Sequence, residues 1–377
     1  MRLVGRRVGP AGGRAMIHDF AVIGGGISGA SAAHGLAASG SVVLLEAEAQ
    51  PGHHATGRSA ALFTPNYGPP VVRRVLALAH GFFHDPPDGL VERPLLSRRG
   101  AITVAAPGEE DRLPPLPRLS PAQALRLAPL LRPERVAATV LDDGVDDIDA
   151  AALHQGYLAG LRARGGEVLT DHRVEAMARE GGAWRLEARR GTVRARVVVN
   201  AAGAWADQVG AVAGAAPIGL VPKRRTAILL DPPEGTDLRA MPLVDFAADA
   251  AYLKPEAGML MASLGDATPC EPSDTQPEEL DVALLAERVE RETTLVIRRI
   301  PHRWAGLRSF VADGAPVVGF DARAPDFLWL AGQGGYGIMM APTLADAATA
   351  LATTGRWPAA MRDGGIAETG LSPHRLT

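Results

Sequence analysis

The segment from Phe20 to Glu46 constrains the fold more than any other part of the chain. An apolar run, Phe20 to Ile23, precedes Gly24-Gly-Gly-Ile-Ser-Gly29, and an alanine-rich segment and a second apolar run then lead to Glu46. Strand, G-x-G-x-x-G turn, helix, strand and acid in this order are typical of a dinucleotide-binding βαβ unit. A glycine-rich turn in an ordinary α/β domain would not require the acid about 20 residues further on.

Each feature of such a unit has a physical reason. Gly24 allows the tight turn, Gly26 lets the backbone approach a pyrophosphate, and Gly29 lets the helix pack closely on the strand. The helix N-terminus offers unpaired N–H groups and a positive dipole to the phosphates. Glu46 is placed to accept the hydroxyls of an unphosphorylated ribose. A nicotinamide-dependent dehydrogenase remains an alternative from this unit alone.

Composition excludes several classes of protein. The chain has 377 residues, a net charge of −3 and no basic block, so it is long enough for two domains and gives no indication of nucleic-acid binding. Cys270 is the only cysteine, which excludes an intrachain disulfide, and we expect no metal site. No apolar run is long enough for a transmembrane segment. Residues 1–15 lack the apolar core of a secretory signal, so we expect a disordered or mis-started N-terminus.

Hydrophobic patterns predict alternating segments of two kinds. Residues 62–140 are rich in proline and look irregular, with short strands such as 101–104. The remaining expected elements are helices at 150–164, 278–291 and 342–351, and β-type segments at 167–169, 184–187, 192–194, 197–199, 218–230, 251–262 and 327–330. We therefore predict an α/β fold in which a Rossmann-like nucleotide domain is interleaved with an α+β domain built on a mostly antiparallel sheet. The predicted segments are 16–65, 142–215 and 305–377 for the first domain, and 66–141 and 216–304 for the second.

Motifs spread along the chain support a more specific interpretation. Beside the fingerprint stand Thr56-Gly-Arg-Ser-Ala-Ala61, Val199-Asn-Ala-Ala-Gly-Ala-Trp205, Trp304-Ala-Gly-Leu-Arg-Ser309 and Gly332-Gln-Gly-Gly-Tyr-Gly-Ile338. Together they resemble the D-amino-acid oxidase/glycine oxidase (DAO) family of FAD-dependent oxidoreductases over nearly the whole chain from Asp19. The segments Pro222-Lys-Arg-Arg225, Tyr252-Leu-Lys-Pro255 and Arg308-Ser-Phe-Val-Ala-Asp-Gly314 look most like bacterial FAD-dependent D-arginine/D-amino-acid dehydrogenases.

The resemblance implies FAD as the cofactor. Attachment should be non-covalent, since the family's covalent forms use a cysteine and Cys270 lies in no such motif. The glycine cluster before the last helix could direct N–H groups at the flavin edge that becomes negative on reduction. The cofactor-binding positions implied by the resemblance are Gly24, Gly26, Ile27, Ser28, Gly29, Glu46, Arg58, Ser59, Ala60, Val174, Ala202, Gly203, Trp205, Gly332, Gly334, Gly335, Tyr336, Gly337 and Ile338.

Four residues match family positions that hold the substrate. Arg225 and Arg308 would bind a carboxylate, because the planar guanidinium fork can bind it with two hydrogen bonds. Tyr252 matches a tyrosine that touches the same carboxylate, and Tyr67 matches one in a mobile loop that closes the site; a packing aromatic is the alternative for Tyr67. Neighbours on a strand face opposite sides, so Arg224 should face solvent or the far side of the sheet.

The chain departs from its nearest relatives where they bind a guanidinium. Their glutamate and histidine are replaced here by Ala101 and Leu62. An unpaired guanidinium buried in such a pocket would cost several kcal/mol. We therefore expect neutral, hydrophobic D-amino acids rather than D-arginine, although Glu92 and Asp245 remain as acids that could substitute. The altered substrate-pocket positions are Leu62, Ala101, Leu243 and Met339.

The expected reaction follows from the resemblance. Hydride transfer from Cα to flavin N5 would convert a D-amino acid to an imino acid, which hydrolyses to a 2-oxo acid and ammonia. The main alternative is a glycine- or sarcosine-type amine oxidase that produces hydrogen peroxide. A 2-hydroxy-acid or glycerol-3-phosphate dehydrogenase and an inactive flavin-binding subunit are more distant alternatives. The electron acceptor, a quinone of the respiratory chain or O2, stays open, and we expect a cytoplasmic protein, with peripheral attachment at the inner membrane face as an alternative.

Overall fold

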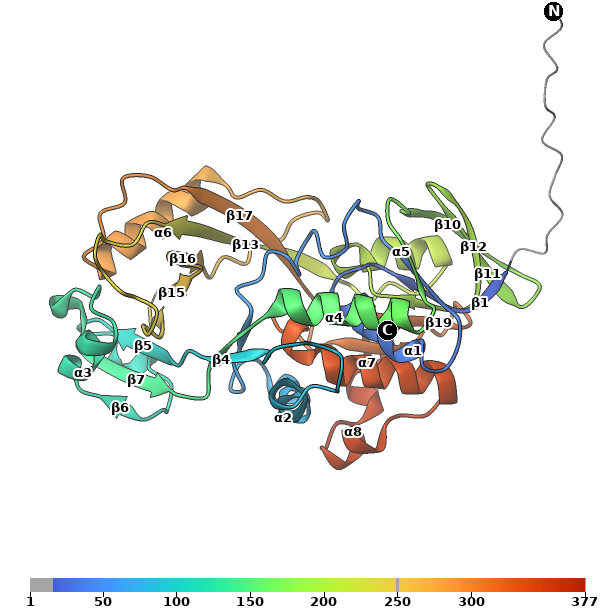
Figure 1. Cartoon of the computed structure of the whole chain (residues 1–377), viewed down its shortest axis with the longest axis horizontal. Coiled ribbons are helices and arrows are strands. Elements are labelled where there is room, and N and C mark those ends of the chain that lie inside the picture. Colours follow the sequence, from blue (N-terminus) through green and yellow to red (C-terminus); the bar gives the residue numbers. More distant parts are fainter. Residues whose placement is uncertain (1–15, 249–250, 377) are drawn as a thin grey trace, which may run out of the picture.

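Two large sheets organise the computed structural model, which describes residues 16–248 and 251–376 (Figure 1). The first sheet runs in the order β10-β11-β12-β1-β2-β9. The C-terminal end of β12, past the part that pairs with β11, also pairs with β19, and β18 pairs with the other side of β19. The strands are β1 (Ile17–Ile23), β2 (Val42–Leu45), β9 (Glu167–Leu169), β10 (Val174–Glu180), β11 (Ala183–Ala188), β12 (Gly191–Asn200), β18 (Val317–Phe320) and β19 (Phe327–Ala331).

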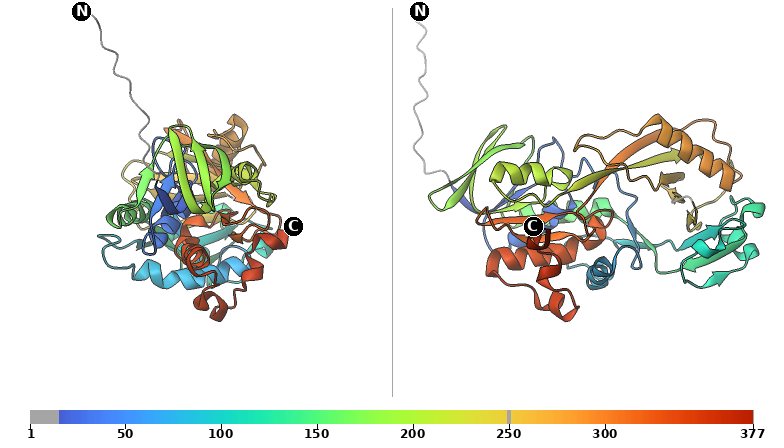
Figure 2. Two further views of the ribbon diagram at one scale, coloured as in Figure 1. Left: turned by 90° about the vertical axis from the view of Figure 1, so that its right-hand side faces the viewer. Right: turned by 180° about the vertical axis from the view of Figure 1, so that it is seen from behind.

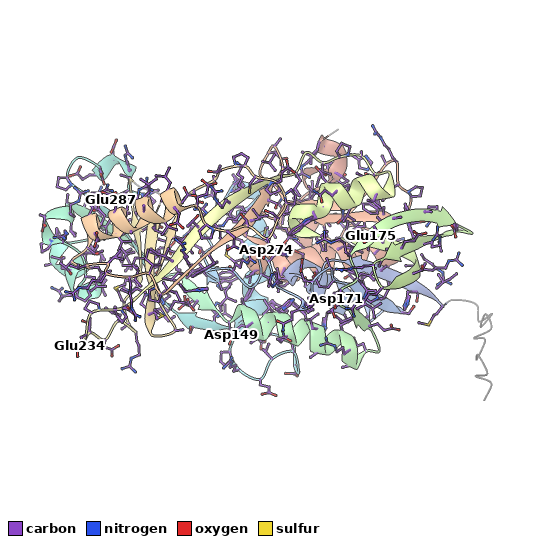
Figure 3. All side chains as sticks on the ribbon, turned by 90° about the horizontal axis from the view of Figure 1, so that it is seen from above. Asp149, Asp171, Glu175, Glu234, Asp274 and Glu287 are labelled. Carbon is purple, nitrogen blue, oxygen red and sulfur yellow. The ribbon has the colours of Figure 1, made fainter. Side chains whose placement is uncertain are left out.

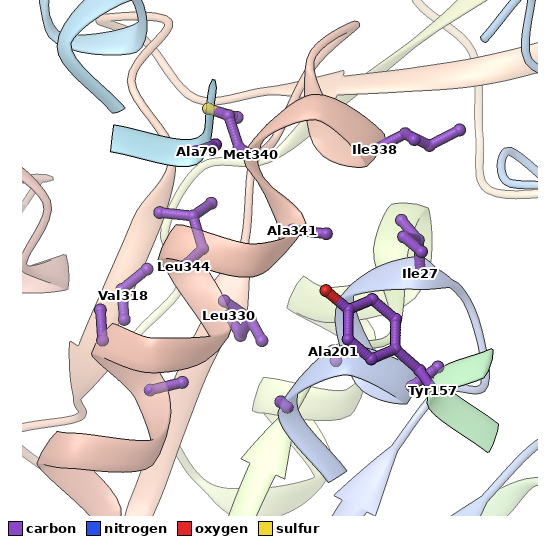
Figure 4. Close-up of a cluster of buried hydrophobic side chains, with 14 of the residues drawn as sticks. Ile27, Ala79, Tyr157, Ala201, Val318, Leu330, Ile338, Met340, Ala341 and Leu344 are labelled. Carbon is purple, nitrogen blue, oxygen red and sulfur yellow. The ribbon is translucent and has the colours of Figure 1, made fainter. Parts of the chain in front are cut away.

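The central strands of this sheet form the predicted nucleotide-binding unit. β1 pairs in parallel with β2 on one side and with β12 on the other. β2 and the C-terminal ends of β1 and β12 are buried on both faces, as their apolar sequences require. Helix α1 (Ile27–Leu36) connects β1 to β2 and packs between α4 (Ala150–Ala163) and α7 (Gly337–Thr354). Figure 4 shows this core, in which Ile27 and Tyr157 face apolar side chains of α7 and β19.

The second sheet has a different character. Its order is β17-β13-β16-β15-β14-β5-β7-β6, and every pair is antiparallel except β5 with β14. Helix α6 (Glu279–Glu292) covers one face through the buried side chains of Val282, Leu285 and Val289. The strands are β5 (Ala101–Ala105), β6 (Arg118–Leu119), β7 (Ala138–Asp142), β13 (Val221–Leu230), β14 (Leu243–Phe246), β15 (Ala251–Glu256), β16 (Met259–Leu264) and β17 (His302–Phe310).

Smaller elements complete the fold. A small three-stranded sheet has the order β3-β8-β4, and its strand β4 lies between the two large sheets (Figure 1). Its strands are β3 (Leu62–Phe63), β4 (Leu96–Arg98) and β8 (Asp146–Ile148), and the further helices are α2 (Pro70–His84), α3 (Pro121–Leu127), α5 (Ala206–Ala213) and α8 (Ala359–Asp363). The described residues also form the short 3-10 turns η1 (Glu110–Arg112), η2 (Pro133–Arg135), η3 (Gly203–Trp205), η4 (Glu368–Gly370) and η5 (Pro373–Leu376).

Three sequence-based expectations about elements were wrong. Residues 62–140 are not irregular throughout, because α2 is a 15-residue helix whose apolar residues Val72, Val75, Leu76, Ala79 and Phe83 recur at helical spacing. The two strands expected at 192–194 and 197–199 are one continuous strand, β12. The last long helix begins at residue 337, five residues before the proline that we took as its start, because the interior of this helix tolerates that proline.

The two large sheets lie at opposite ends of an elongated molecule. Figure 2 shows β10 to β12 at one end and α3 with β5 to β7 at the other. In Figure 3, Asp274 lies near the middle, between Glu287 on α6 and Glu175 on β10. The predicted domain boundary at residue 305 falls inside β17, which belongs wholly to the second sheet. The prediction for residues 1–15 lies outside the described part of the chain.

Candidate active site

A cavity of about 680 Å³ lies between the two large sheets and receives residues from both. The nucleotide fingerprint lines one part of it, and the open face of the second sheet lines another. Segments from residue 23 to residue 339 therefore meet around one space. A cavity of this size and length of lining matches a large, elongated ligand rather than a small metabolite alone.

The fingerprint glycines act through backbone contacts. Gly24 has a φ of +104°, and a Cβ atom on it would lie 2.4 Å from the carbonyl oxygen of Ala201. A Cβ on Gly29 would lie 1.8 Å from the carbonyl oxygen of Gly24. Gly29 is not among the residues that line the cavity. Its missing side chain instead allows α1 to pack against the Gly24 turn, which does line the cavity. The two positions do what the sequence pattern requires of them.

Two helices begin at the cavity. α1 starts after Gly26 and α7 after Tyr336, and the side-chain hydroxyl of Ser28 donates a 2.7 Å hydrogen bond to Oε1 of Gln333. The first-turn N–H of Ile27 donates to the hydroxyl of Thr56 at 2.9 Å. Because helix N-termini carry partial positive charge, their convergence creates a region that favours anionic ligand groups.

Glu46 occupies the position expected for a ribose-binding acid. It is buried, lines the cavity, and accepts hydrogen bonds from the backbone N–H of Gly25 at 2.7 Å and of Glu48 at 2.8 Å. Nearby, Nε2 of His54 lies 3.1 Å from a carboxylate oxygen of Glu48, and the His54 ring lies 4.6 Å from the Trp205 ring. Two backbone hydrogen bonds thus hold the acid just beyond the carboxyl end of β2.

At the other end of the cavity the structure brings two arginines together. Arg225 on β13 and Arg308 on β17 both line it, and neither forms an ion pair with an acid of the described residues. Nη1 of Arg225 donates to the carbonyl of Leu264 at 2.8 Å, while its Nε is buried without a partner. Burial, together with the nearby Arg308 charge, lowers the pKa of Arg225. Such a pair is suited to bind an anionic ligand, which would supply the negative charge that no directly paired protein acid supplies.

Strand alternation separates Arg225 from its neighbour Arg224 as predicted. Arg224 is buried on the opposite side of β13, where Nη2 lies 3.0 Å from Asp281 of α6 and Nη1 bonds to Glu278. Arg224 is therefore compensated by direct ion pairs, whereas Arg225 makes none with the described residues. Arg308 lies against bare backbone, since a Cβ on Gly335 would come within 3.0 Å of its Nη1.

Three tyrosines surround this region. Tyr252 on β15 lines the cavity, and burial raises the pKa of its phenol, so the group remains a neutral hydrogen-bond donor. Tyr67 also lines the cavity but is 44% exposed, and its ring lies 5.1 Å from that of Tyr336. Tyr336 is not among the lining residues and contacts Tyr67 through an edge-on ring arrangement.

The wall of the cavity beyond Tyr252 is one face of the second sheet. Leu243 of β14 pairs with Ala101 of β5, and Asp245 pairs with Tyr252 of β15. The side chains that alternate with these point at α6 and form its core. Leu62 and Met339 reach the same cavity from the other side.

Of the cofactor-binding and substrate-binding positions that the resemblance implied, all but Gly29 and Tyr336 line the cavity. Those that do are Gly24, Gly26, Ile27, Ser28, Glu46, Arg58, Ser59, Ala60, Leu62, Tyr67, Ala101, Val174, Ala202, Gly203, Trp205, Arg225, Leu243, Tyr252, Arg308, Gly332, Gly334, Gly335, Gly337, Ile338 and Met339. Arg58 is already engaged, because Nη1 donates to the carbonyls of Thr275 and Ala305 and Nη2 pairs with Asp274. Glu92 is not among the lining residues, whereas Asp245 is.

Several lining residues were missed from sequence. Gln333 lies within the Gly332–Ile338 motif, but no local sequence pattern indicates that it contacts Ser28, which is 305 residues away. Thr56 begins another quoted motif, and its role as acceptor for α1 could have been inferred from its hydroxyl. Other polar lining residues that we did not predict are Glu48, His53, His54, Thr64, His172, Arg173, Gln208, Ser263 and Ser309.

One side-chain group among the described residues has the composition of a metal site. His53, His54 and Asp274 offer ligand atoms within 4.8 Å of one another. Asp274, however, is paired with Arg58, and His54 with Glu48. These partners compete with an ion for the same atoms.

Comparison with known proteins identifies the family. The pattern described as "FAD dependent oxidoreductase" (DAO) matches residues 19–351. The chain belongs to this DAO family. FAD is accordingly its cofactor, as the sequence predicted, and the α/β architecture is the family's FAD-binding fold. Solved relatives share this fold: L-proline dehydrogenase from P. horikoshii has a TM-score of 0.80 at 21% identity, covering 96% of this chain and 98% of that one.

Other similarities agree with the family but span it unevenly. Glycine oxidase from Geobacillus kaustophilus has a TM-score of 0.76 at 20% identity, covering 91% of this chain and 96% of that one. A 97-residue stretch is 34% identical to mitochondrial dimethylglycine dehydrogenase of Homo sapiens, covering 26% of this chain and 11% of that protein. Aerobic glycerol-3-phosphate dehydrogenase of Escherichia coli strain K12 is 30% identical over 220 residues, covering 50% of this chain and 42% of that protein. These curated relatives are thus matched over less than half of their length.

The DAO-family cavity fits FAD by its own chemistry. Nε2 of Gln333 and Nε of Arg225 are buried donors without partners in the described structure, and both residues line the cavity. Gly203, with a φ of +56°, leaves open space where a side chain would stand. The residues that would hold the nucleotide half are the fingerprint and Glu46, and those facing the ring half come from the 332–338 motif. No helix among the described residues is long and apolar enough to span a membrane.

Proposed function

We propose that the chain oxidises the Cα-amine of a D-amino acid to an imino acid, which water then converts to a 2-oxo acid and ammonia. The observation that carries the proposal is the unpaired arginine pair, Arg225 and Arg308, next to Tyr252 in the FAD cavity. An amino-acid carboxylate supplies the negative charge that this site lacks. Bound FAD supplies the acceptor for the two electrons removed from the substrate.

The protein's own groups would position the substrate. Arg225 and Arg308 bind the carboxylate, and the neutral phenol of Tyr252 donates to one of its oxygens. Fixing the carboxylate fixes the adjacent Cα, which limits the orientations of its C–H bond; such positioning supplies much of an enzyme's rate. Tyr67, exposed at the mouth of the cavity, would exclude water when substrate is present.

The side chain of the substrate would meet an apolar wall. The four positions from which we expect a neutral substrate all line the cavity: Leu62, Ala101, Leu243 and Met339. An apolar side chain buried there gains about 25 cal/mol for each Å² removed from water. A D-amino acid with several side-chain carbons therefore fits better than glycine or sarcosine. The D configuration rests on the motif resemblance, and the similar solved structures include an L-proline dehydrogenase and a glycine oxidase.

Anaerobic flavin reduction tests this proposal. Purified holoprotein is mixed with D- and L-amino acids, glycine and sarcosine, and the loss of the oxidised-flavin absorbance is followed. We expect D-norvaline and D-norleucine to bleach the flavin faster than their L forms or glycine. Bleaching by glycine or sarcosine alone would favour the amine-oxidase alternative. Reoxidation of the reduced protein by air, against a quinone, then identifies the electron acceptor.

The clamp is tested by paired variants. Arg225→Met should lose turnover while it retains FAD, because the guanidinium lies at the ring end and not at the fingerprint. Arg224→Met is the matched control, since it removes the neighbouring guanidinium from the opposite face of the same strand. Equal losses of turnover in both variants, measured per bound flavin, would contradict the clamp.

A further inference from the structure

Asp245 is the unexplained charged group in the apolar wall. It lies on β14, with Tyr252 opposite it on β15 and Thr103 opposite it on β5, and it lines the FAD cavity. The alternate residues Val244 and Leu253 point to the other face and pack in the α6 core. The carboxylate therefore faces the cavity, and among the described residues it has no hydrogen bond or ion pair.

The absence of a partner distinguishes Asp245 from the other acids nearby. Asp147, for example, pairs with Arg99 at 2.5 Å and with Lys254 at 2.9 Å. Burial raises the pKa of Asp245 to about 6, which shows what its environment costs the charged form. An ionised carboxylate in such a place is stabilised most by a cation that arrives with the ligand.

The spacing of the strands indicates which cation can reach it. A carboxylate held by Arg225 on β13 and Tyr252 on β15 would lie over β16, the strand between them. Asp245 on β14 is two strands further, about 10 Å away at 4.7–4.9 Å per strand. The α-amine lies only about 2.5 Å from its own carboxylate carbon by standard bond lengths. The α-amine therefore does not reach Asp245.

A group at the end of a longer side chain does reach it. An extended chain advances about 1.2 Å per bond, so the terminal nitrogen of a four-carbon side chain lies about 6 Å from Cα. Adding a charged hydrogen bond of about 2.8 Å closes the remaining distance. Leu243 and Ala101 flank the path on the same sheet face, and both would contact the methylene groups of such a stem.

We propose that Asp245 is a specificity-determining residue that binds the terminal ammonium of a substrate side chain. This inference rests on the proposed function and extends its substrate class. Beside neutral side chains, the site then takes D-amino acids with a three- or four-carbon apolar stem and an ammonium at the end. The apolar wall binds the stem, and Asp245 binds the end.

Matched substrate pairs test the inference. kcat/KM is measured for D-lysine against D-norleucine and for D-ornithine against D-norvaline, using holoprotein of the wild type and of Asp245→Asn. The variant should lose about ten- to a hundredfold for D-lysine and D-ornithine, the range for a hydrogen bond to a charged group. The values for D-norleucine and D-norvaline should change less than threefold.

A conservative variant supplies an independent readout. Asp245→Glu keeps the charge but extends it by one methylene group, so it should move the preference from D-lysine towards D-ornithine. Asp88→Asn, at an exposed acid, is the control for general effects of the substitution.

The outcomes separate this inference from the proposed function. Turnover of D-norleucine without turnover of D-lysine by the wild type overturns the role of Asp245 and leaves the proposed function standing. Equal losses for both members of a pair in Asp245→Asn also overturn it. If no D-amino acid reduces the flavin of the wild type, both are refuted.

Discussion

Replacing Asp245 by asparagine should stabilise the flavin-free protein at neutral pH. Burial raises the pKa of this carboxyl from 3.8 to about 6, so the folded state binds the proton more tightly than the unfolded state. A difference of about 2 pH units corresponds to about 3 kcal/mol at 1.36 kcal/mol per unit. The variant removes this cost, while its amide keeps the shape of the side chain.

The pH dependence follows from the sign of the shift. As pH rises from 3.8 to about 6, the unfolded chain releases the Asp245 proton first, so the wild type loses stability over this window and no more above it. The gain from Asp245→Asn should therefore rise from about 1 kcal/mol at pH 4.5 to about 3 kcal/mol at pH 7.5. Any constant cost of burying the amide cancels in this difference.

Urea unfolding of flavin-free wild type and variant, followed by tryptophan fluorescence, measures the gain at each pH. Asp88→Asn, at an exposed acid, should show no comparable trend and serves as the control. A gain that does not change between pH 4.5 and 7.5 would show that Asp245 is already compensated in the folded protein, which would refute the reasoning.

Three further predictions concern the cavity. Arg308→Lys should lower kcat/KM by about a hundredfold with flavin retained, because a lysine cannot make the two-pronged carboxylate contact; steady-state kinetics per bound flavin checks this. Gly29→Ala should give protein without flavin, since the new methyl group would lie 1.8 Å from the Gly24 carbonyl oxygen; the absorbance ratio at 450 and 280 nm, about that of free protein, would show it. Arg224→Met should lower the free energy of unfolding by about 3 kcal/mol and leave KM within about twofold, because it breaks a buried ion pair on the α6 side of the sheet; a large KM increase would contradict this placement.

Local patterns predicted the nucleotide half of the molecule well. The β1–α1–β2 unit was recognised because the turn, the helix start and Glu46 lie within 27 consecutive residues. The opposite directions of Arg224 and Arg225 followed from strand alternation alone. Helix α2 was missed, although its apolar spacing is regular, because the prolines around it suggested an irregular segment.

Long-range relations were beyond reach of the sequence. The hydrogen bond between Ser28 and Gln333 joins positions 305 residues apart, and no local signal couples them. Likewise, an aspartate at position 245 reads as an ordinary polar residue on a strand. Only the assembled sheet shows that it faces the cavity and that it makes no hydrogen bond or ion pair among the described residues.

The way in which α1 and α7 meet has a consequence for synthesis of the protein on the ribosome. The fingerprint is among the first parts of the described chain to emerge, yet α1 packs against α7 and its Ser28 hydroxyl bonds to Gln333. β12, which lies beside β1 in the sheet, pairs with β19 of the same late segment. A nascent chain therefore holds an incomplete cofactor cavity until about residue 354 has left the exit tunnel. Capture of FAD is then one of the last events of folding, and chains truncated before α7 will be colourless and exposed to proteolysis.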